Sequence, residues 1–124
     1  MAPRVLVVDD EEVFADLARD QLGARGFEVA VASSGEEALA AAAENPPDVI
    51  LLDVLLPGLA GDEVLRRLKS DPRTKAVPVV VCSVTLRERV AQERLLALGA
   101  SAFVSKPCKP DDLAARLREV LPPT

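Results

Sequence analysis

Five short runs of branched apolar residues alternate along the chain with five stretches of helical periodicity, and this repeat limits the possible folds. The first, third and fourth runs are almost continuously apolar, as in parallel strands that helices cover on both faces. We therefore predict an α/β fold with a doubly wound, five-stranded parallel sheet. The predicted strands are Arg4–Val8, Phe27–Ala32, Val49–Leu52, Pro78–Cys82 and Ala102–Val104.

The ends of the predicted helices are marked by residues that commonly cap helices. Ser34 begins a capping box, in which its hydroxyl can accept a hydrogen bond from the amide of Glu37. Gly26 and Gly99 stand where the first and fourth helices must end. The last helix carries an apolar stripe that can pack on the sheet, formed by Leu113, Leu117, Val120 and Leu121.

The length of the chain indicates a single domain. Its 124 residues are enough to bury a core without disulfides or a structural metal. We expect one domain over residues 1–124, in which residues 121–124 are either a terminus or the start of a linker to an output domain.

The composition argues against several functions. A net charge of -5 disfavours direct binding to nucleic acid, which depends on Lys and Arg side chains that neutralise phosphates. The chain has no histidine, tyrosine or tryptophan, and so lacks the commonest general base, zinc ligand and base-stacking groups. It also has no signal-peptide pattern, no apolar stretch of the roughly 20 residues that cross a bilayer, and too few cysteines for a disulfide framework. We expect a cytoplasmic protein without a membrane partner.

Polar residues follow four of the five predicted strands. Asp9-Asp10, Asp53, Ser83 and Lys106 come after the first, third, fourth and fifth strands. In open α/β sheets, ligands bind at the carboxyl edge, where the strand order reverses. If the strand order is 2-1-3-4-5, as in flavodoxin-like folds, the three aspartates converge. Each residue alone has an ordinary explanation, because strand-end aspartates often cap helices.

Three carboxylates in one pocket require a cation if all are to stay ionised. Oxygen ligands alone suit a hard ion such as Mg²⁺ rather than zinc, and Lys106 would add a second positive charge. Mg²⁺, an ammonium and the Ser83 hydroxyl together suit phosphoryl transfer, because they can neutralise the phosphoryl oxygens. The nucleophile would be Asp53, since a carboxylate can form an aspartyl phosphate and the chain has no histidine to activate a serine.

This ordered set of residues resembles the response-regulator receiver domain and is similar to the single-domain chemotaxis regulator. The resemblance rests on Asp9-Asp10, on Asp53 followed by Pro57 and Gly61, on Ser83 and on Lys106-Pro107, and it covers essentially the whole chain. No single motif is specific, but the ordered set is. The resemblance implies a (βα)5 receiver of two-component signalling.

The resemblance also implies roles for individual residues. Asp53 would accept the phosphoryl group, and Ser83 and Lys106 would contact the phosphoryl oxygens. Asp10, Asp53 and the Leu55 carbonyl would ligate Mg²⁺, and Asp9 would hold it through water. The peptide before Pro107 would be cis.

The resemblance implies partners and a switch as well. The phosphoryl donor would be a sensor histidine kinase or a histidine phosphotransfer protein. Phe103 would turn inward when Ser83 moves toward the phosphoryl group, although ordinary core packing also explains this residue. An effector would bind the face of the fourth helix, fifth strand and fifth helix, on or near which lie Arg87, Arg89 and Arg94. The protein would be a monomer, or a dimer when phosphorylated, and not a turnover enzyme.

Some residues depart from the family pattern. Val84 replaces a small residue after Ser83. Together with Leu55 and Thr85, it is expected to make the opening to the phosphorylation site narrow and weakly polar. We therefore expect slow loss of the phosphoryl group, because water is poorly admitted. Ala60 replaces an aspartate before Gly61. Cys108 lies in a loop where an aromatic residue is common, and we expect it to be more reactive than Cys82, a small buried apolar residue.

Three alternatives remain open at this point. A flavodoxin-like cofactor binder shares the topology, but Asp9 to Glu12 would repel a phosphate, and three phenylalanines are few for binding a flavin. A haloacid-dehalogenase-like phosphatase also uses an aspartate and Mg²⁺, but its nucleophile follows the first strand in an Asp-x-Asp arrangement. The third alternative is an interaction scaffold that is not phosphorylated.

Overall fold

Within the described residues, the sheet and five helices form the α/β arrangement that the alternating pattern predicts. The computed structural model describes residues 2–56, 58–83, 89–106 and 108–121, except the side chains of residues 83 and 89–91. The strands are β1 (Arg4–Val8), β2 (Glu28–Ala32), β3 (Val49–Asp53), β4 (Val79–Ser83) and β5 (Ala102–Ser105). The helices are α1 (Glu12–Gly23), α2 (Gly35–Glu44), α3 (Gly61–Ser70), α4 (Arg89–Ala97) and α5 (Pro110–Val120).

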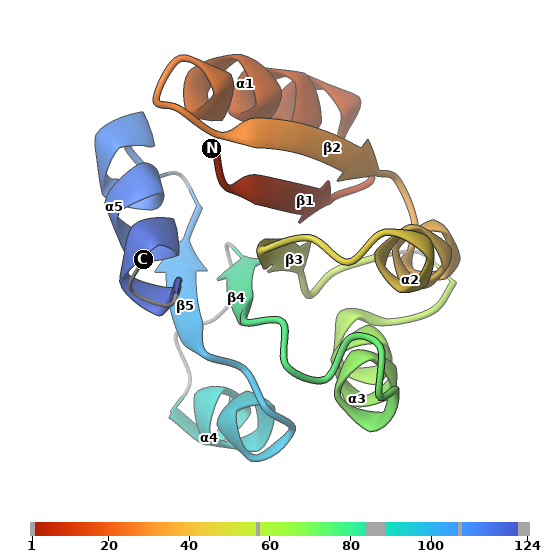
Figure 1. Ribbon diagram of the computed structural model, residues 1–124. Coiled ribbons are helices and arrows are strands. Elements are labelled where there is room, and N and C mark those ends of the chain that lie inside the picture. The colour runs from red at the N-terminus through yellow and green to blue at the C-terminus, as the bar shows by residue number, and fades with distance from the viewer. Residues whose placement is uncertain (1, 57, 84–88, 107, 122–124) are drawn as a thin grey trace.

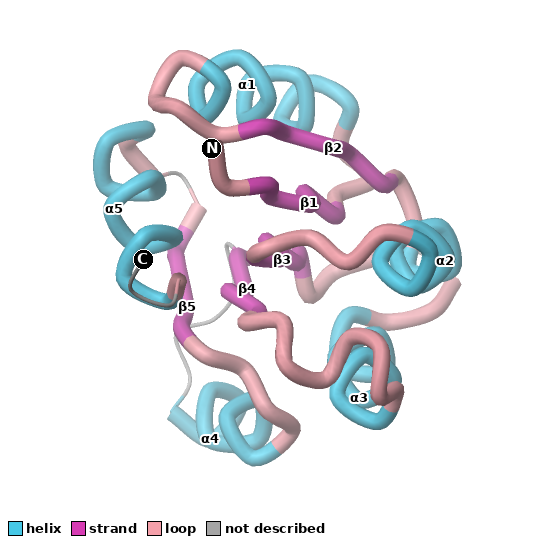
Figure 2. The backbone as a smooth tube through the Cα atoms, in the orientation of Figure 1, coloured by secondary structure: helices cyan, strands magenta, loops and turns pink. Residues whose placement is uncertain are grey.

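The strands are all parallel and lie in the order β2-β1-β3-β4-β5, which confirms the predicted order 2-1-3-4-5. Helices α1 and α5 cover one face of the sheet, and α2, α3 and α4 cover the other (Figure 1). The order reverses between β1 and β3, whose carboxyl ends are therefore neighbours. Figure 2 shows the loops that leave these strand ends for the helices.

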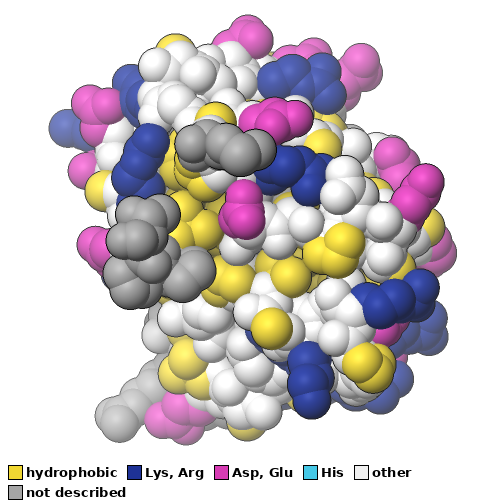
Figure 3. Space-filling model, in the orientation of Figure 1, with side chains coloured by type: hydrophobic (Ala, Val, Ile, Leu, Met, Phe, Trp, Pro, Cys, Tyr) yellow, Lys and Arg dark blue, Asp and Glu magenta, His cyan; other side chains and the backbone are white. Residues whose placement is uncertain are grey.

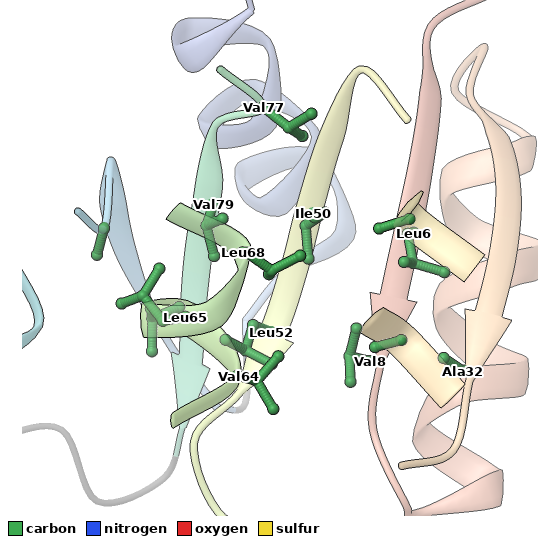
Figure 4. Packing of buried hydrophobic residues seen from close by; sticks show 14 of the residues in the cluster. Leu6, Val8, Ala32, Ile50, Leu52, Val64, Leu65, Leu68, Val77 and Val79 are labelled. Carbon is green, nitrogen blue, oxygen red and sulfur yellow. The ribbon is translucent and has the colours of Figure 1, made fainter. Parts of the chain in front are cut away.

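Two apolar clusters, one on each face of the sheet, hold the layers together. Alternate residues of β1 face opposite clusters, as the two-residue period of a strand requires. Leu6 and Val8 join the cluster under α2, α3 and α4, whereas Val5 and Val7 join the one under α1 and α5. Figure 4 shows Leu65 and Leu68 of α3 lying over the strands of the first cluster. Every residue of β3 is buried, as expected for a central parallel strand.

The strand boundaries differ from prediction by single residues, for local reasons. Strands β3, β4 and β5 each continue one residue further than predicted. Strand β4 begins at Val79, because proline has no N–H with which to pair, although the Pro78 carbonyl accepts from the Ile50 amide at 3.0 Å. Strand β2 begins at Glu28, because the Phe27 amide donates to the Leu22 carbonyl at the end of α1.

The predicted helix caps are present. The Glu37 amide donates to the Ser34 hydroxyl at 3.1 Å, whereas the Glu37 carboxylate bonds the Ser33 hydroxyl at 2.9 Å. Gly26 and Gly99 have φ values of 94° and 111°, which favour glycine at a helix end. In α5, Leu113 and Leu117 are buried, and Val120 and Leu121 pack against the same cluster.

Charged side chains are mixed on the surface. On the face drawn in Figure 3, Lys and Arg side chains are scattered among Asp and Glu side chains, and the described part of that face shows no continuous basic stripe. Within the described ranges, no helix is long and apolar enough to span a membrane.

Candidate functional site

The aspartates predicted to converge do lie together at the carboxyl edge of the sheet. Asp9 directly follows β1 and Asp53 ends β3, and the preceding residues Val8 and Leu52 are paired in the sheet. Carboxylate oxygens of Asp9, Asp10 and Asp53 all lie within 4.8 Å of one another. Asp9 and Asp53 are only 2% and 5% exposed, whereas Asp10 is exposed. The site is therefore a mostly buried acidic cluster with one side open to solvent.

Lys106 places its ammonium between the two buried carboxylates. It directly follows β5, and its Nζ donates to Asp9 Oδ2 at 2.6 Å and to Asp53 Oδ2 at 3.0 Å. Glu11 Oε1 is 3.7 Å from the same nitrogen. With 9% of its side chain exposed, Lys106 is nearly as buried as its partners. It supplies the cationic charge that the adjoining strand tips require.

Each buried carboxylate is also fixed by the backbone that follows it. Asp53 Oδ1 accepts from the Leu55 amide at 3.0 Å, and Asp9 Oδ1 accepts from the Glu11 amide at 2.9 Å. In both residues one oxygen is thus held by the next turn of chain and the other by Lys106. The folded chain thus sets the orientation of each carboxylate.

The electrostatics of the site favour a bound cation. Burial raises the pKa of the Asp53 carboxyl above 3.8, although its hydrogen bonds from Leu55 and Lys106 act in the opposite direction. Burial alone would lower the pKa of the Lys106 ammonium, but the hydrogen bonds that it donates to Asp9 and Asp53 outweigh burial and leave the pKa raised. Lys106 therefore stays protonated, yet its charge does not fully offset the desolvation of Asp53.

The donor set fits a hard divalent cation. Among the described residues, the cluster offers carboxylate oxygens close enough together to share one ion, and this is the chemistry that Mg²⁺ prefers. The Leu55 amide contacts Asp53, whereas ligation by the Leu55 carbonyl remains a prediction.

Gly61 allows the start of α3 to lie against the backbone that follows Asp53. A Cβ at this position would lie 2.6 Å from Val54 Cα and 2.8 Å from the Asp53 carbonyl oxygen. The Gly61 amide donates to the Val54 carbonyl at 3.1 Å. These neighbours are backbone atoms that cannot rotate away, so the absence of a side chain at Gly61 is part of how Asp53 is positioned.

Replacing Gly61 by alanine is therefore expected to destabilise the protein by about 1–3 kcal/mol, the usual cost of overpacking. The shift of the loop should also slow any reaction at Asp53. Urea unfolding followed by circular dichroism would measure the stability. Gly23→Ala is the control, because a Cβ there meets nothing within 4 Å. Equal stability of the Gly61→Ala and Gly23→Ala proteins would show that the close approach at Gly61 does not contribute to the stability of the fold.

The remaining predicted residues are only partly covered by the structure. Ser83 pairs with Ser105 in the sheet, but its side chain lies outside what the structure describes, as does that of Arg89. Phe103 is partly buried against the cluster under α2, α3 and α4, and its role as a switch stays a prediction. Further predicted positions outside the described residues are Pro57, Val84, Thr85, Arg87 and Pro107.

The cysteines are free thiols with raised pKa values. Cys82 is buried as predicted, and burial raises the pKa of its thiol to about 12. Burial also raises the pKa of the partly buried Cys108, whose Sγ lies 3.6 Å from the Lys109 carbonyl. A thiol with a raised pKa forms less of the reactive thiolate, which applies to both cysteines. Cys108 is the less buried of the two, and its higher reactivity relative to Cys82 stays a prediction.

Two contacts near the site were not predicted. The Phe14 ring lies under the Lys106 ammonium, with its centroid 4.0 Å from Nζ. Arg94 of α4 forms an ion pair with Asp62 in the first turn of α3, at 3.1 Å. Phe14 lies in the first turn of α1, only four residues after Asp10, and this closeness in sequence could have suggested that its ring lies near the acidic cluster.

Comparison with known proteins places this chain in a known family. The sequence matches the response regulator receiver domain over residues 5–118. The response regulator PleD of Caulobacter vibrioides is 44% identical over 120 residues, which are 97% of this chain and 26% of PleD. The phosphate regulon transcriptional regulatory protein PhoB of Rhizobium meliloti is 40% identical over 122 residues, which are 98% of this chain and 53% of PhoB.

A solved structure shows the same fold. The chemotaxis protein CheY4 of Vibrio cholerae superposes with a TM-score of 0.92 and 30% identity, over 98% of this chain and 100% of that protein. The chain thus spans the whole length of CheY4, but only 26% of PleD and 53% of PhoB.

Proposed function

The chain belongs to the response regulator receiver domain family of two-component signalling, and we propose that Asp53 is its phosphoryl acceptor and that the acidic cluster binds Mg²⁺. The observation that carries the proposal is the position of Asp53. Its carboxylate is buried at the carboxyl edge of the sheet, next to Asp9 and Asp10 and hydrogen-bonded to Lys106. Family membership removes the reason to prefer a flavodoxin-like cofactor binder or a dehalogenase-like phosphatase.

The proposed reaction is attack by an Asp53 carboxylate oxygen on phosphorus. A new O–P bond forms, and the P–N bond of a phosphohistidine or the P–O bond of acetyl phosphate breaks, so that the electron pair leaves with the donor. Mg²⁺ held by Asp9, Asp10, Asp53 and the Leu55 carbonyl would neutralise the phosphoryl oxygens. The hydrogen bond from the Leu55 amide to Asp53 orients the nucleophile throughout.

Lys106 changes partners in this proposal. Before the reaction its ammonium bonds both buried carboxylates. Phosphorylation moves negative charge away from the Asp53 carboxylate and onto the phosphoryl group, so the ammonium follows that charge to a phosphoryl oxygen. Ser83 would bind another phosphoryl oxygen, and this movement would be coupled to Phe103 in β5.

Receiver domains act between histidine kinases and effectors, and we place this chain in the same position. We propose that a histidine kinase or histidine phosphotransfer protein donates the phosphoryl group and that an effector binds the α4-β5-α5 face. The protein would act in the cytoplasm, without direct contact to nucleic acid, and its only chemistry would be its own phosphorylation and slow dephosphorylation. The net charge of -5 and the scattered basic side chains support the absence of direct nucleic-acid contact.

Binding of beryllofluoride tests the proposal without a kinase. Beryllofluoride resembles a phosphoryl group on a carboxylate, and with Mg²⁺ we expect it to shift the backbone NMR signals around Asp53, Leu55 and Lys106. Asp53→Ala should remove these shifts, whereas Asp20→Ala, on the exposed face of α1, should retain them. The proposal is wrong if the wild type shows no shifts, or if they persist in Asp53→Ala.

The phosphoryl group is expected to be lost slowly. Leu55, Val84 and Thr85 would admit the hydrolytic water poorly, and Leu55 is 55% exposed beside the acidic cluster. Val84→Ala should therefore speed the decay of phosphorylated protein after the donor is removed, as followed by intact-protein mass spectrometry. Decay of the wild type within seconds would contradict this prediction.

A further inference from the structure

The face of the Phe14 ring lies against the Lys106 ammonium. The ring centroid is 4.0 Å from Nζ, well inside the roughly 6 Å over which an aromatic face attracts a cation. This attraction grows where water is excluded. Because only 9% of the Lys106 side chain is exposed, we expect this cation–π contact to be stronger than one at an exposed site.

Among the described residues, the Lys106 ammonium donates hydrogen bonds to two carboxylates, which leaves its third N–H group available to the ring. Two N–H groups of Lys106 donate to Asp9 and Asp53, and the Glu11 carboxylate at 3.7 Å is too distant for a hydrogen bond. The ring itself is held in place, because Phe14 packs against the apolar cluster under α1 and α5. The fixed ring thus supports the ammonium independently of both carboxylates.

We propose that Phe14 is a positioning residue for Lys106, which keeps the ammonium at the site while its hydrogen bonds pass from a carboxylate to a phosphoryl oxygen. The proposal rests on the proposed function of Asp53. A hydrogen bond to Asp9 or Asp53 is lost when Lys106 turns, whereas attraction to a ring face tolerates sideways movement. A leucine would fill the same apolar space but would offer no negative face to the ammonium.

The ring contact can be measured in the resting protein, without Mg²⁺ or a donor. Protons over an aromatic face are shielded, so the Hε signals of Lys106 should lie upfield of those of the exposed Lys75 and Lys109. Phe14→Leu should move them to the position of the exposed lysines. Unshielded Lys106 signals in the wild type would show that the contact does not form.

The consequence for the reaction is tested with acetyl phosphate and Mg²⁺, because a small donor does not require docking of a partner protein. Phe14→Leu should slow phosphorylation about 5- to 30-fold, corresponding to the strength of a partly to fully desolvated cation–π contact. Phe14→Tyr, which keeps the ring, should restore the rate. The affinity for Mg²⁺ should be unchanged, as measured by calorimetry, since the chain has no tryptophan or tyrosine for fluorescence.

Leu17→Ala is the matched control. Leu17 lines a pocket together with Phe14 and Lys106, and its side chain is half exposed, so that it can be removed without exposing the core. The Leu17→Ala protein should be phosphorylated by acetyl phosphate at the wild-type rate. An unchanged rate in Phe14→Leu, or a slow rate in Phe14→Tyr, overturns the positioning role. If acetyl phosphate fails to modify the wild type, the proposed function fails instead, and the shielding of Lys106 still decides whether the ring holds the ammonium.

Discussion

Replacing Lys106 by methionine is expected to destabilise the Mg²⁺-free protein by about 3–5 kcal/mol, the usual cost of leaving a buried charge without its partner. The substitution keeps the apolar stem but removes the ammonium that bonds Asp9 and Asp53. Both carboxylates are nearly inaccessible to water, so solvent cannot replace the lost charge. Two buried like charges would then repel each other.

Urea unfolding with and without Mg²⁺ would measure this effect. Mg²⁺ should stabilise the Lys106→Met protein more than the wild type, because the ion then supplies the only positive charge in the cluster. The exposed Lys109 provides the control, since Lys109→Met should unfold at nearly the wild-type urea concentration. Equal stability of the two variants would mean that Lys106 does not neutralise the acidic cluster.

Asp53→Asn is expected to prevent phosphorylation and, at neutral pH without Mg²⁺, to stabilise the folded protein. Asparagine keeps an acceptor for the Leu55 amide but has neither the nucleophilic oxygen nor the buried charge. The pKa of Asp53 is raised in the folded state above 3.8, chiefly by burial. The folded state therefore favours the protonated, neutral form of Asp53. The wild type is stabilised at low pH and loses this stability as Asp53 ionises, when the pH rises through the folded-state pKa.

The stability difference should depend on pH accordingly. It should be smallest below pH 3.8, where Asp53 is protonated in both states, and should reach its full value above the raised pKa. Thermal unfolding over this range would measure it, with Asp20→Asn as the control on the exposed face of α1. A stability difference that does not change with pH would show that ionisation of Asp53 is not its cause.

The sequence was sufficient to predict the sheet and the aspartate cluster. Parallel strands share one carboxyl edge, so residues at the ends of adjacent strands must meet whatever the details of packing. Helix ends were predictable because a cap depends on neighbouring residues, as for the hydroxyl of Ser34 and the amide of Glu37. These features follow from short-range chemistry and strand order.

Contacts between side chains far apart in the sequence could not be predicted in the same way. The partners of Lys106 lie 97 and 53 residues away, and the choice between a carboxylate and a phosphoryl oxygen depends on what occupies the site. The importance of Gly61 appears only when its neighbours are known to be backbone atoms. The contact of Phe14 with Lys106 required the orientation of α1 relative to the end of β5.

The most direct test of the central claim is to locate the phosphoryl group after incubation with Mg²⁺ and acetyl phosphate. Intact-protein mass spectrometry would count the groups added, and peptide mapping would identify the modified residue. We predict one phosphoryl group on Asp53, formed only with Mg²⁺ and absent from Asp53→Ala. An unmodified wild type, or a phosphoryl group on another residue, would contradict the assignment of Asp53 as the acceptor.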